Sequence, residues 1–383
     1  MYSIYHITFA SITDYLGYGL QIDTCLNNNI DVKILDISKI FNFPKPQHSK
    51  QFKKLVIEID TYNELFDFIS RLEIKNSIVN IQITYEWRFK EIFRMMSRLN
   101  QHKFSIFLLG QLPFHSQHSL VDKFFTTSIS KLPKKIVTQI ISRLLFKLNF
   151  LKLQNILFYA GETLSSLPAK KAKFPINFFD YDRYLESSSS KTECYAVFLD
   201  DGLFQHPDDK IVGNIITSEL QSNYRKSLNH FFDFVEKTMK IKVIVSPHPK
   251  VNYTDNFFGS REVVLNRSRE LVQNSKIVLC HCSSSISFAV CYNKPIYFLT
   301  DDNIISFSKK FQPFNEYIHN FATHLNRPVV NLSEPLMPWN EEANQIDQVA
   351  YNNFKLNYLT TIQTQNVLTK DIIIKDLLEV FNN

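Results

Sequence analysis

The sequence predicts an α/β protein with two Rossmann-type domains that face one another across a cleft. Three observations lead to this prediction. Short apolar runs alternate with amphipathic segments, the alternation stops in a polar and aromatic stretch at residues 169–193, and it then starts again. Strands that alternate with helices build a mostly parallel sheet covered by helices on both faces. We therefore expect one domain at residues 1–175 and a second at residues 190–383.

The first half of the chain alternates strand-like and helix-like segments. Residues 18–29 and 87–101 carry apolar side chains at the spacing that predicts helices. The chain has 7 glycines and contains neither G-x-G-x-x-G nor G-x-x-x-x-G-K-[ST], so the sequence does not support a standard dinucleotide or P-loop site. The strand-like runs of this half are residues 3–10, 31–37, 53–59, 77–84, 104–110 and 156–161.

The second half repeats the alternation after a break. Residues 169–193 combine lysines, a proline, aromatic residues and four consecutive serines, which indicates a linker between domains. Beyond it, residues 218–240 predict a long amphipathic helix. The strand-like runs of this half are residues 194–199, 241–246, 261–265, 276–280 and 294–299.

The positive charge of the chain is concentrated in one segment. The chain carries 43 Lys and Arg against 37 Asp and Glu, a formal charge of +6, and Lys131–Lys152 alone holds six basic residues and no acidic one. Its apolar residues recur at helical spacing. The segment is therefore either a core-packing helix with a basic outer face or a surface that binds an anionic membrane. No nucleic-acid-binding motif accompanies it, so we expect no nucleic-acid partner.

Cysteine usage and the start of the chain indicate a cytoplasmic protein. The five cysteines are odd in number and unevenly spread, which favours a reducing compartment. The first residues lack the basic start and apolar core of a signal peptide, and no run of about 18 apolar residues occurs. Cys280 and Cys282 flank His281, but no second ligand pair lies at zinc-site spacing, so we predict no metal site.

Polar groups follow three of the apolar runs in the second half. Asp200-Asp201-Gly202 follows the first, Ser246-Pro247-His248-Pro249 the second, and the segment from His281 to Ser285 the third. Each alone has an ordinary explanation as a turn or a helix cap. Together, at the carboxyl ends of strands in one sheet, they predict a site with a carboxylate, an imidazole and the donors of a helix N-terminus. Such donors favour an anion such as phosphate.

These three elements, in this order on a two-Rossmann scaffold, resemble the bacterial GT-B-type sialyltransferases and related transferases that use CMP-activated nonulosonic acids. The matching residues are Asp200-Asp201-Gly202 for a D/E-D/E-G element, His248-Pro249 for an HP element and Ser283-Ser284-Ser285 for a serine cluster. Residues 178–186 and 195–209 are also similar to bacterial surface-carbohydrate biosynthesis proteins. The resemblance covers the second half by motif and the first half only as a fold.

The resemblance implies a GT-B-like fold, an acceptor-side domain at residues 1–175 and a nucleotide-sugar-binding domain at residues 190–383. It also implies metal-independent, inverting transfer without a cofactor. By analogy, Asp200 would be the general base for the acceptor hydroxyl. His248 would contact the leaving phosphate, and the serines would hold it.

Other residues near these motifs are further candidates for the site. Asp201 and Gly202 belong to the same strand end as Asp200. His206 starts a second HP pair, which either shapes the acceptor side or forms a turn; we favour the turn. Asp180-Tyr181-Asp182 is a D-x-D, the pattern with which many other glycosyltransferases hold a metal, but its setting favours a structural role. Arg261, Arg267 and Arg269 either line a nucleotide pocket or are solvated, and we favour the second interpretation.

Three functions remain open from the sequence. The first is transfer of sialic, pseudaminic or legionaminic acid from its CMP donor to a capsule or lipopolysaccharide acceptor, on a glycan or a lipid-linked glycan at the inner face of the cytoplasmic membrane. The second is a CMP-Kdo transferase or a CDP-alcohol phosphotransferase, since teichoic-acid-type polymerases also pair HP with a downstream serine cluster. The third is a non-catalytic scaffold for envelope-glycan assembly.

Overall fold

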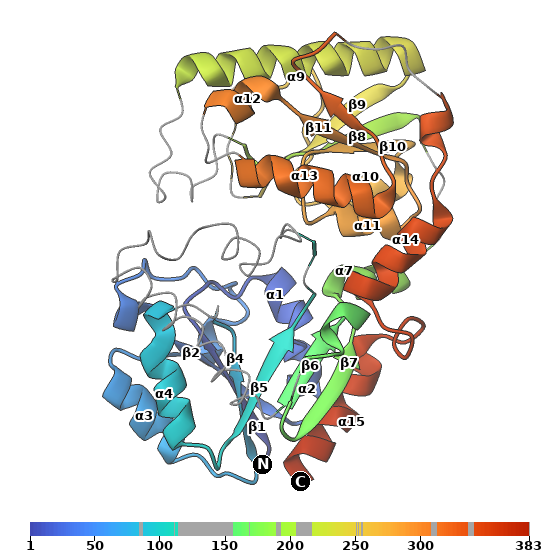
Figure 1. The fold of residues 1–383 in the computed structure, drawn as a ribbon. Helices are drawn as coiled ribbons and strands as arrows, with labels where there is room; N and C mark the ends of the chain where they lie inside the picture. Colours follow the sequence, from blue (N-terminus) through green and yellow to red (C-terminus); the bar gives the residue numbers. More distant parts are fainter. Residues whose placement is uncertain are drawn as a thin grey trace, which may run out of the picture. The chain divides into compact units, whose positions relative to one another are not determined.

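The computed structural model describes most of the chain as two units (Figure 1). Each unit is built around a parallel β-sheet, so the predicted α/β fold with two Rossmann-type domains is confirmed. The described residues are 1–83, 87–110, 112–113, 156–167, 169–188, 193–203, 217–249, 251, 253, 256–307, 312–335 and 341–382.

The first unit has a seven-stranded sheet in the order β3-β2-β1-β4-β5-β6-β7. Helices α3 and α4 lie on one face of this sheet (Figure 1), where their apolar sides form a shared core with the strands. The strands are β1 (Ser3–Thr8), β2 (Asp31–Asp36), β3 (Val56–Glu58), β4 (Ser77–Ile81), β5 (Lys103–Leu108), β6 (Ile156–Ala160) and β7 (Ala172–Ile176). The helices are α1 (Asp14–Gly19), α2 (Ile22–Asn27), α3 (Tyr62–Ser70), α4 (Lys90–Arg98) and α7 (Phe179–Leu185).

Two sequence predictions for the first unit were wrong in detail. The helix expected at residues 18–29 is divided between α1 and α2, because Gln21 adopts a left-handed conformation with φ of 55°. The segment at residues 169–193, expected to be a linker, contains β7 and α7. Pro175 misled that prediction. It lies in β7, the edge strand of the sheet, where a missing N–H is tolerated.

The second unit has a five-stranded sheet in the order β12-β11-β10-β8-β9. The segment at residues 261–265 was expected to be a strand, but it forms only an isolated parallel bridge between Val263 and Val245. The strands are β8 (Tyr195–Leu199), β9 (Lys242–Ser246), β10 (Ile277–Cys280), β11 (Ile296–Thr300) and β12 (Val329–Asn331). The helices are α9 (Ser218–Met239), α10 (Ser268–Asn274), α11 (Ile286–Cys291), α12 (Asp302–Phe307), α13 (Gln312–Leu325) and α14 (Gln348–Phe354).

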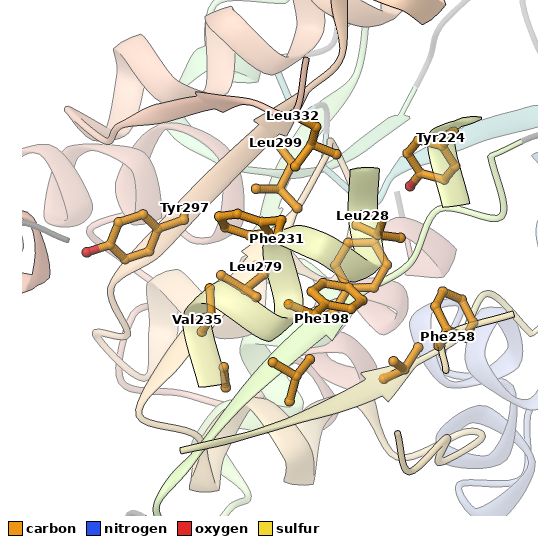
Figure 2. Packing of buried hydrophobic residues seen from close by; sticks show 14 of the residues in the cluster. Phe198, Tyr224, Leu228, Phe231, Val235, Phe258, Leu279, Tyr297, Leu299 and Leu332 are labelled. Atoms are coloured by element: carbon orange, nitrogen blue, oxygen red, sulfur yellow. The ribbon is translucent and has the colours of Figure 1, made fainter. Parts of the chain in front are cut away.

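Helix α9 covers one face of the second sheet. Thr217 caps its N-terminus by accepting the N–H of Leu220 at 3.2 Å, and one side of the helix is apolar throughout its length. Figure 2 shows Leu228, Phe231 and Val235 of this helix against the strand residue Phe198 and its neighbours. This packing holds α9 against the sheet, with Tyr224 on its buried side.

The end of the chain returns to the first unit. The chain passes from the first unit to the second between Leu185 and Glu186, and it comes back at Asn357. Helix α15 (Thr369–Asn382) therefore packs beside α2 and β7. The sequence analysis had assigned these residues to the second domain. Amphipathic spacing predicts a helix with one buried side, but it does not say which sheet that side will cover.

Both ends of α15 are held by buried polar side chains of the first unit. At its start, Asp182 accepts the N–H of Thr369 at 3.0 Å. At its end, the ammonium group of Lys103 donates to the carbonyl oxygens of Val380 and Phe381, both at 2.8 Å. An anion at a helix N-terminus and a cation at its C-terminus both oppose the helix dipole. The helix is thus fastened electrostatically as well as by its apolar side.

The D-x-D pattern has the structural contacts that its setting predicted. Asp180 and Asp182 are both buried. Asp180 accepts a hydrogen bond from the hydroxyl group of Tyr15, and Asp182 accepts one from Asn177 at 2.8 Å in addition to the bond from α15.

Two sequence-based predictions fall on residues outside those described. Lys131–Lys152 is one, so its assignment as a membrane-binding surface stays a prediction. His206 is the other. Among the described helices, none is long and apolar enough to cross a membrane.

The contact between Asp182 and α15 gives a test of this arrangement. Asp182→Ala leaves the buried N–H of Thr369 without its acceptor, which costs about 1–3 kcal/mol. We expect the variant to have a lower denaturation midpoint than the unmutated protein. Asp371→Ala, at an exposed position in the first turn of the same helix, is the control and should have little effect. Equal stability of the Asp182→Ala protein would contradict the anchoring role.

Candidate active site

The three predicted motifs lie at neighbouring strand ends. Strand β8 pairs in parallel with β10 on one side and with β9 on the other, and Leu199 at its end lies level with both Cys280 and Ser246. Parallel strands present their carboxyl ends at the same edge of a sheet. The segments that follow these strands, which carry the Asp-Asp-Gly, His-Pro and serine motifs, therefore leave the sheet side by side.

Asp200 binds the turn after β9. Its Oδ2 accepts hydrogen bonds from the hydroxyl group of Tyr253 at 2.6 Å and from the backbone N–H of His248 at 3.2 Å. The residue is 6% exposed. Burial raises the pKa of its carboxyl group, and the hydrogen bonds from Tyr253, His248 and Gly202 oppose that rise. Asp200 thus connects the end of β8 to the turn after β9.

Asp201 binds the turn after β10, on the other side. Its Oδ2 accepts the backbone N–H of Cys282 at 2.9 Å, and its carboxyl group also bonds to the side chain of Ser283. The residue as a whole is half-buried, but its carboxyl group is surrounded by protein, which affects its pKa. Burial, with a smaller contribution from the charge of Asp200, raises the pKa of Asp201 to about 7. This carboxyl group is therefore poised to exchange a proton near neutral pH.

Gly202 is required where it stands. It has φ of +70°, a conformation that other residues rarely adopt. A Cβ atom at this position would lie 2.6 Å from Cγ2 of Val251 and 3.2 Å from Cβ of His248. Glycine therefore lets the strand end approach the turn after β9 closely enough for the bonds of Asp200 to form.

The His-Pro turn extends from a buried base to an exposed end. Pro247 is buried, His248 is half-buried and Pro249 is exposed. The turn is closed by the N–H of Val251, which donates to the carbonyl oxygen of His248 at 3.0 Å. The backbone N–H of the same histidine is held by Asp200. The backbone of His248 is thus held by Asp200 after β8 and by Val251 within the turn.

The serine triplet forms the turn between β10 and α11. Ser284 is exposed, whereas Ser283 and Ser285 are half-buried. The hydroxyl group of Ser287, in the first turn of α11, donates to the carbonyl oxygen of Ser284 at 3.0 Å. Ser283 accepts the N–H of Ser285 at a long 3.4 Å. The turn is therefore organised by short-range bonds and by Asp201, with the side chain of Ser284 facing solvent.

His281 has a structural role at the end of β10. The residue is 1% exposed, and burial lowers its pKa to about 4, so the ring is neutral near pH 7. Its Nδ1 lies 2.7 Å from the carbonyl oxygen of Leu299, which only accepts, so Nδ1 carries the proton. Its Nε2 then accepts the hydroxyl proton of Tyr224 at 2.8 Å.

Both nitrogens of His281 are therefore occupied within the protein. The flanking Cys280 and Cys282 are buried, which raises the pKa of each thiol well above its usual value. Among the described residues, no group of three or more His, Cys, Asp or Glu side chains is arranged to hold a metal ion.

Two tyrosines of this region were missed by the sequence analysis. Tyr224 lies on the buried side of α9, and Tyr253 lies in the segment after β9, packed against the rings of Phe257 and Phe258. Burial raises the pKa of both hydroxyl groups, and the charge of Asp200 raises it further. Both tyrosines therefore remain neutral hydrogen-bond donors. No spacing in the sequence distinguishes them from other core aromatic residues.

Arg261 differs from its expected solvated state. Its side chain is 8% exposed and forms ion pairs with Asp233 at 2.5 Å and Glu236 at 2.7 Å, both on α9. It lines a polar cavity of about 740 Å³ between α9 and the start of β9 at Lys242. That cavity lies toward the amino end of β9, whereas the three motifs follow the carboxyl ends of the strands. We therefore do not assign it to the same site.

The comparisons with known proteins rest on structure alone. No protein-family model and no curated protein sequence matches the chain. The wall teichoic acid polymerase TagF, as its H444N variant, aligns over 100% of this chain and 90% of its own with a TM-score of 0.51 and 11% identity. MurG of Acinetobacter baumannii aligns over 99% of this chain and 100% of its own at a TM-score of 0.47 and 7% identity. The likeness to TagF shows that the chain has the GT-B fold.

The pKa of Asp201 gives a test that needs no substrate. Because this pKa is about 7 in the folded protein and 3.8 in ordinary surroundings, the folded chain retains a proton that the unfolded chain has released between these values. Stability should therefore fall as pH rises through this window. In Asp201→Asn, the melting temperature should fall less between about pH 5 and about pH 8 than in the unmutated protein.

An exposed carboxylate of the same unit provides the control for this measurement. Glu219→Gln, in the first turn of α9, should leave the pH dependence of the melting temperature as it is. If Asp201→Asn also leaves it unchanged, the assigned ionisation of Asp201 is wrong.

Proposed function

We propose that this protein is a glycosyltransferase that moves a nonulosonic acid from a CMP-activated donor to a glycan or lipid-linked glycan acceptor. One observation carries the proposal. Carboxylates, a histidine and a serine turn follow the adjacent parallel strands β8, β9 and β10 of a GT-B fold. The edge formed by the carboxyl ends of parallel strands is where ligands bind in open α/β sheets.

The proposed chemistry needs groups of the kinds that these strand ends carry. The donor has a phosphate on its anomeric carbon, so transfer requires a base for the acceptor hydroxyl and stabilisation of the charge on the departing phosphate. His248 with Pro249, and the serines Ser283 to Ser285, would contact that phosphate. A carboxylate at the end of β8 would take the acceptor's proton. The hydrogen-bond donors of the histidine and the serines can stabilise the charge of the phosphate without a metal ion.

A second candidate is a CDP-alcohol phosphotransferase. The observation that favours it is the structural likeness to a wall teichoic acid polymerase, together with the HP and serine motifs that teichoic-acid-type polymerases share. A CMP-Kdo transferase would use the same phosphate contacts as the leading proposal. A scaffold without catalytic activity would need none of them.

Nucleotide preference separates the CMP-sugar transferases from the CDP-alcohol phosphotransferase and from the scaffold. We expect calorimetry to show binding of CMP in preference to CDP and UDP, because CMP is the product that the proposed sugar donor releases. Preference for CDP would favour the phosphotransferase instead. Absence of binding by all three nucleotides would remove all three enzyme candidates and leave the scaffold.

The serine turn and His248 give a residue-level test of the donor site. Joint replacement of Ser284 and Ser285 by Ala should weaken CMP binding without lowering the melting temperature, since Ser284 is exposed and Ser285 half-buried. His248→Ala should reduce both CMP affinity and turnover, because its ring would contact the phosphate before and during transfer. Ser260→Ala, at the distant cavity beside Arg261, is the matched control. Unchanged CMP affinity in the variants would exclude these residues from the donor site.

A further inference from the structure

The two aspartates that follow β8 differ in their hydrogen-bond partners and in their exposure to solvent. The Oδ2 of Asp200 already receives two protons in hydrogen bonds, from Tyr253 at 2.6 Å and from the N–H of His248 at 3.2 Å. The residue has 6% of its surface exposed. Asp201 also receives two hydrogen bonds, from the N–H of Cys282 at 2.9 Å and from the side chain of Ser283, but the residue is half-buried and so more exposed than Asp200. Counted over the whole residue, more of the surface of Asp201 than of Asp200 is open to solvent.

We propose that Asp201 accepts the proton of the acceptor hydroxyl and that Asp200 is a positioning residue which, with Tyr253, fixes the turn of His248. The inference rests on the proposed transferase function and takes Asp201 in place of Asp200 as the base. In the step, the acceptor's O–H bond breaks and its proton goes to the Asp201 carboxylate. The acceptor oxygen bonds to the anomeric carbon, and the bond from that carbon to the phosphate oxygen breaks with its electron pair on the phosphate.

The ionisation of Asp201 suits this role. Burial, opposed in part by the Cys282 N–H, raises the pKa of Asp201 to about 7, so this carboxyl group changes its charge near neutral pH. Asp200 is the residue whose charge contributes to the raised pKa of Asp201. Burial raises the pKa of the other titratable groups around it and keeps them neutral at this pH: Tyr224 on α9, Tyr253 after β9, Cys280 on β10 and Cys282 in its turn.

The positioning role of Asp200 is carried by its partners. Tyr253 is held in place by ring contacts with Phe257 and Phe258 at centroid distances of 4.8 and 4.7 Å. Its hydroxyl group ends at the oxygen that also accepts the N–H of His248. Loss of the Asp200 carboxylate removes the bond to the N–H of His248, and loss of the Tyr253 hydroxyl group removes the second bond to the same oxygen. Among the described residues, the carboxyl group of Asp201 bonds to Cys282 and Ser283 in the turn after β10, so its loss should leave the turn of His248 in place.

The experiment compares Asp200→Asn, Asp201→Asn and Tyr253→Phe in the full chain, with CMP affinity, kcat, KM and the pH dependence of kcat measured for each. Asp201→Asn should lower kcat by about 10²–10⁴-fold with CMP affinity retained, and it should abolish the rise in kcat centred near pH 7. Asp201→Glu should restore part of the activity and of that rise. Asp200→Asn and Tyr253→Phe should resemble each other, with weaker CMP binding and the pH profile preserved.

The outcomes separate this inference from the function on which it rests. If Asp200→Asn abolishes the rise near pH 7 while Asp201→Asn retains it, Asp200 is the base and the inference is wrong, although the transferase function stands. If the unmutated protein binds cytidine nucleotides and catalyses transfer but Asp201→Asn has full activity, the inference is also wrong alone. If the unmutated protein neither binds a nucleotide nor transfers a sugar, the proposed function is wrong, and this inference with it.

Discussion

The parallel pairing of β8 between β9 and β10 is the constraint on which the candidate site depends. It brings residues that are far apart in the chain, such as Asp200, His248 and Ser283, to one edge of one sheet. An antiparallel partner at either position would send its following turn to the opposite edge. The apolar cover provided by α9 keeps these strands together, so the packing shown in Figure 2 supports the site without contributing to its chemistry.

The end of β8 shows how a protein can keep two adjacent carboxylates in a largely buried place. Burial of a charged group is costly unless hydrogen bonds replace water. Here each carboxylate obtains its bonds from a different neighbouring turn, Asp200 from the one after β9 and Asp201 from the one after β10. The same bonds therefore satisfy the carboxylates and fix the turns. The two residues, both aspartates in the sequence, thus differ in exposure and in the turn that each one binds.

The sequence allowed prediction of features that depend on local pattern. The strands that end at Leu199, Ser246 and Cys280 were recognisable because each buried run is contiguous with the polar residues that follow it. Features decided by distant contacts were not recognisable. The bond of Tyr253 to Asp200 spans 53 residues, and the burial of Arg261 depends on acids placed by α9. The sequence around an aromatic residue or an arginine does not indicate which distant residue it will contact in the folded protein.

The return of α15 to the first unit has a consequence for how the chain acquires its structure during synthesis. The second unit runs from Glu186 to Leu356, with residues 112 and 113 as its only earlier part among the described residues. The first unit is not continuous in sequence, because its last helix is made after the entire second unit. Domains generally fold as units while the chain emerges. The side of the first unit that α15 covers therefore stays uncovered while more than a hundred intervening residues are translated, and the part of the protein that begins first is completed last.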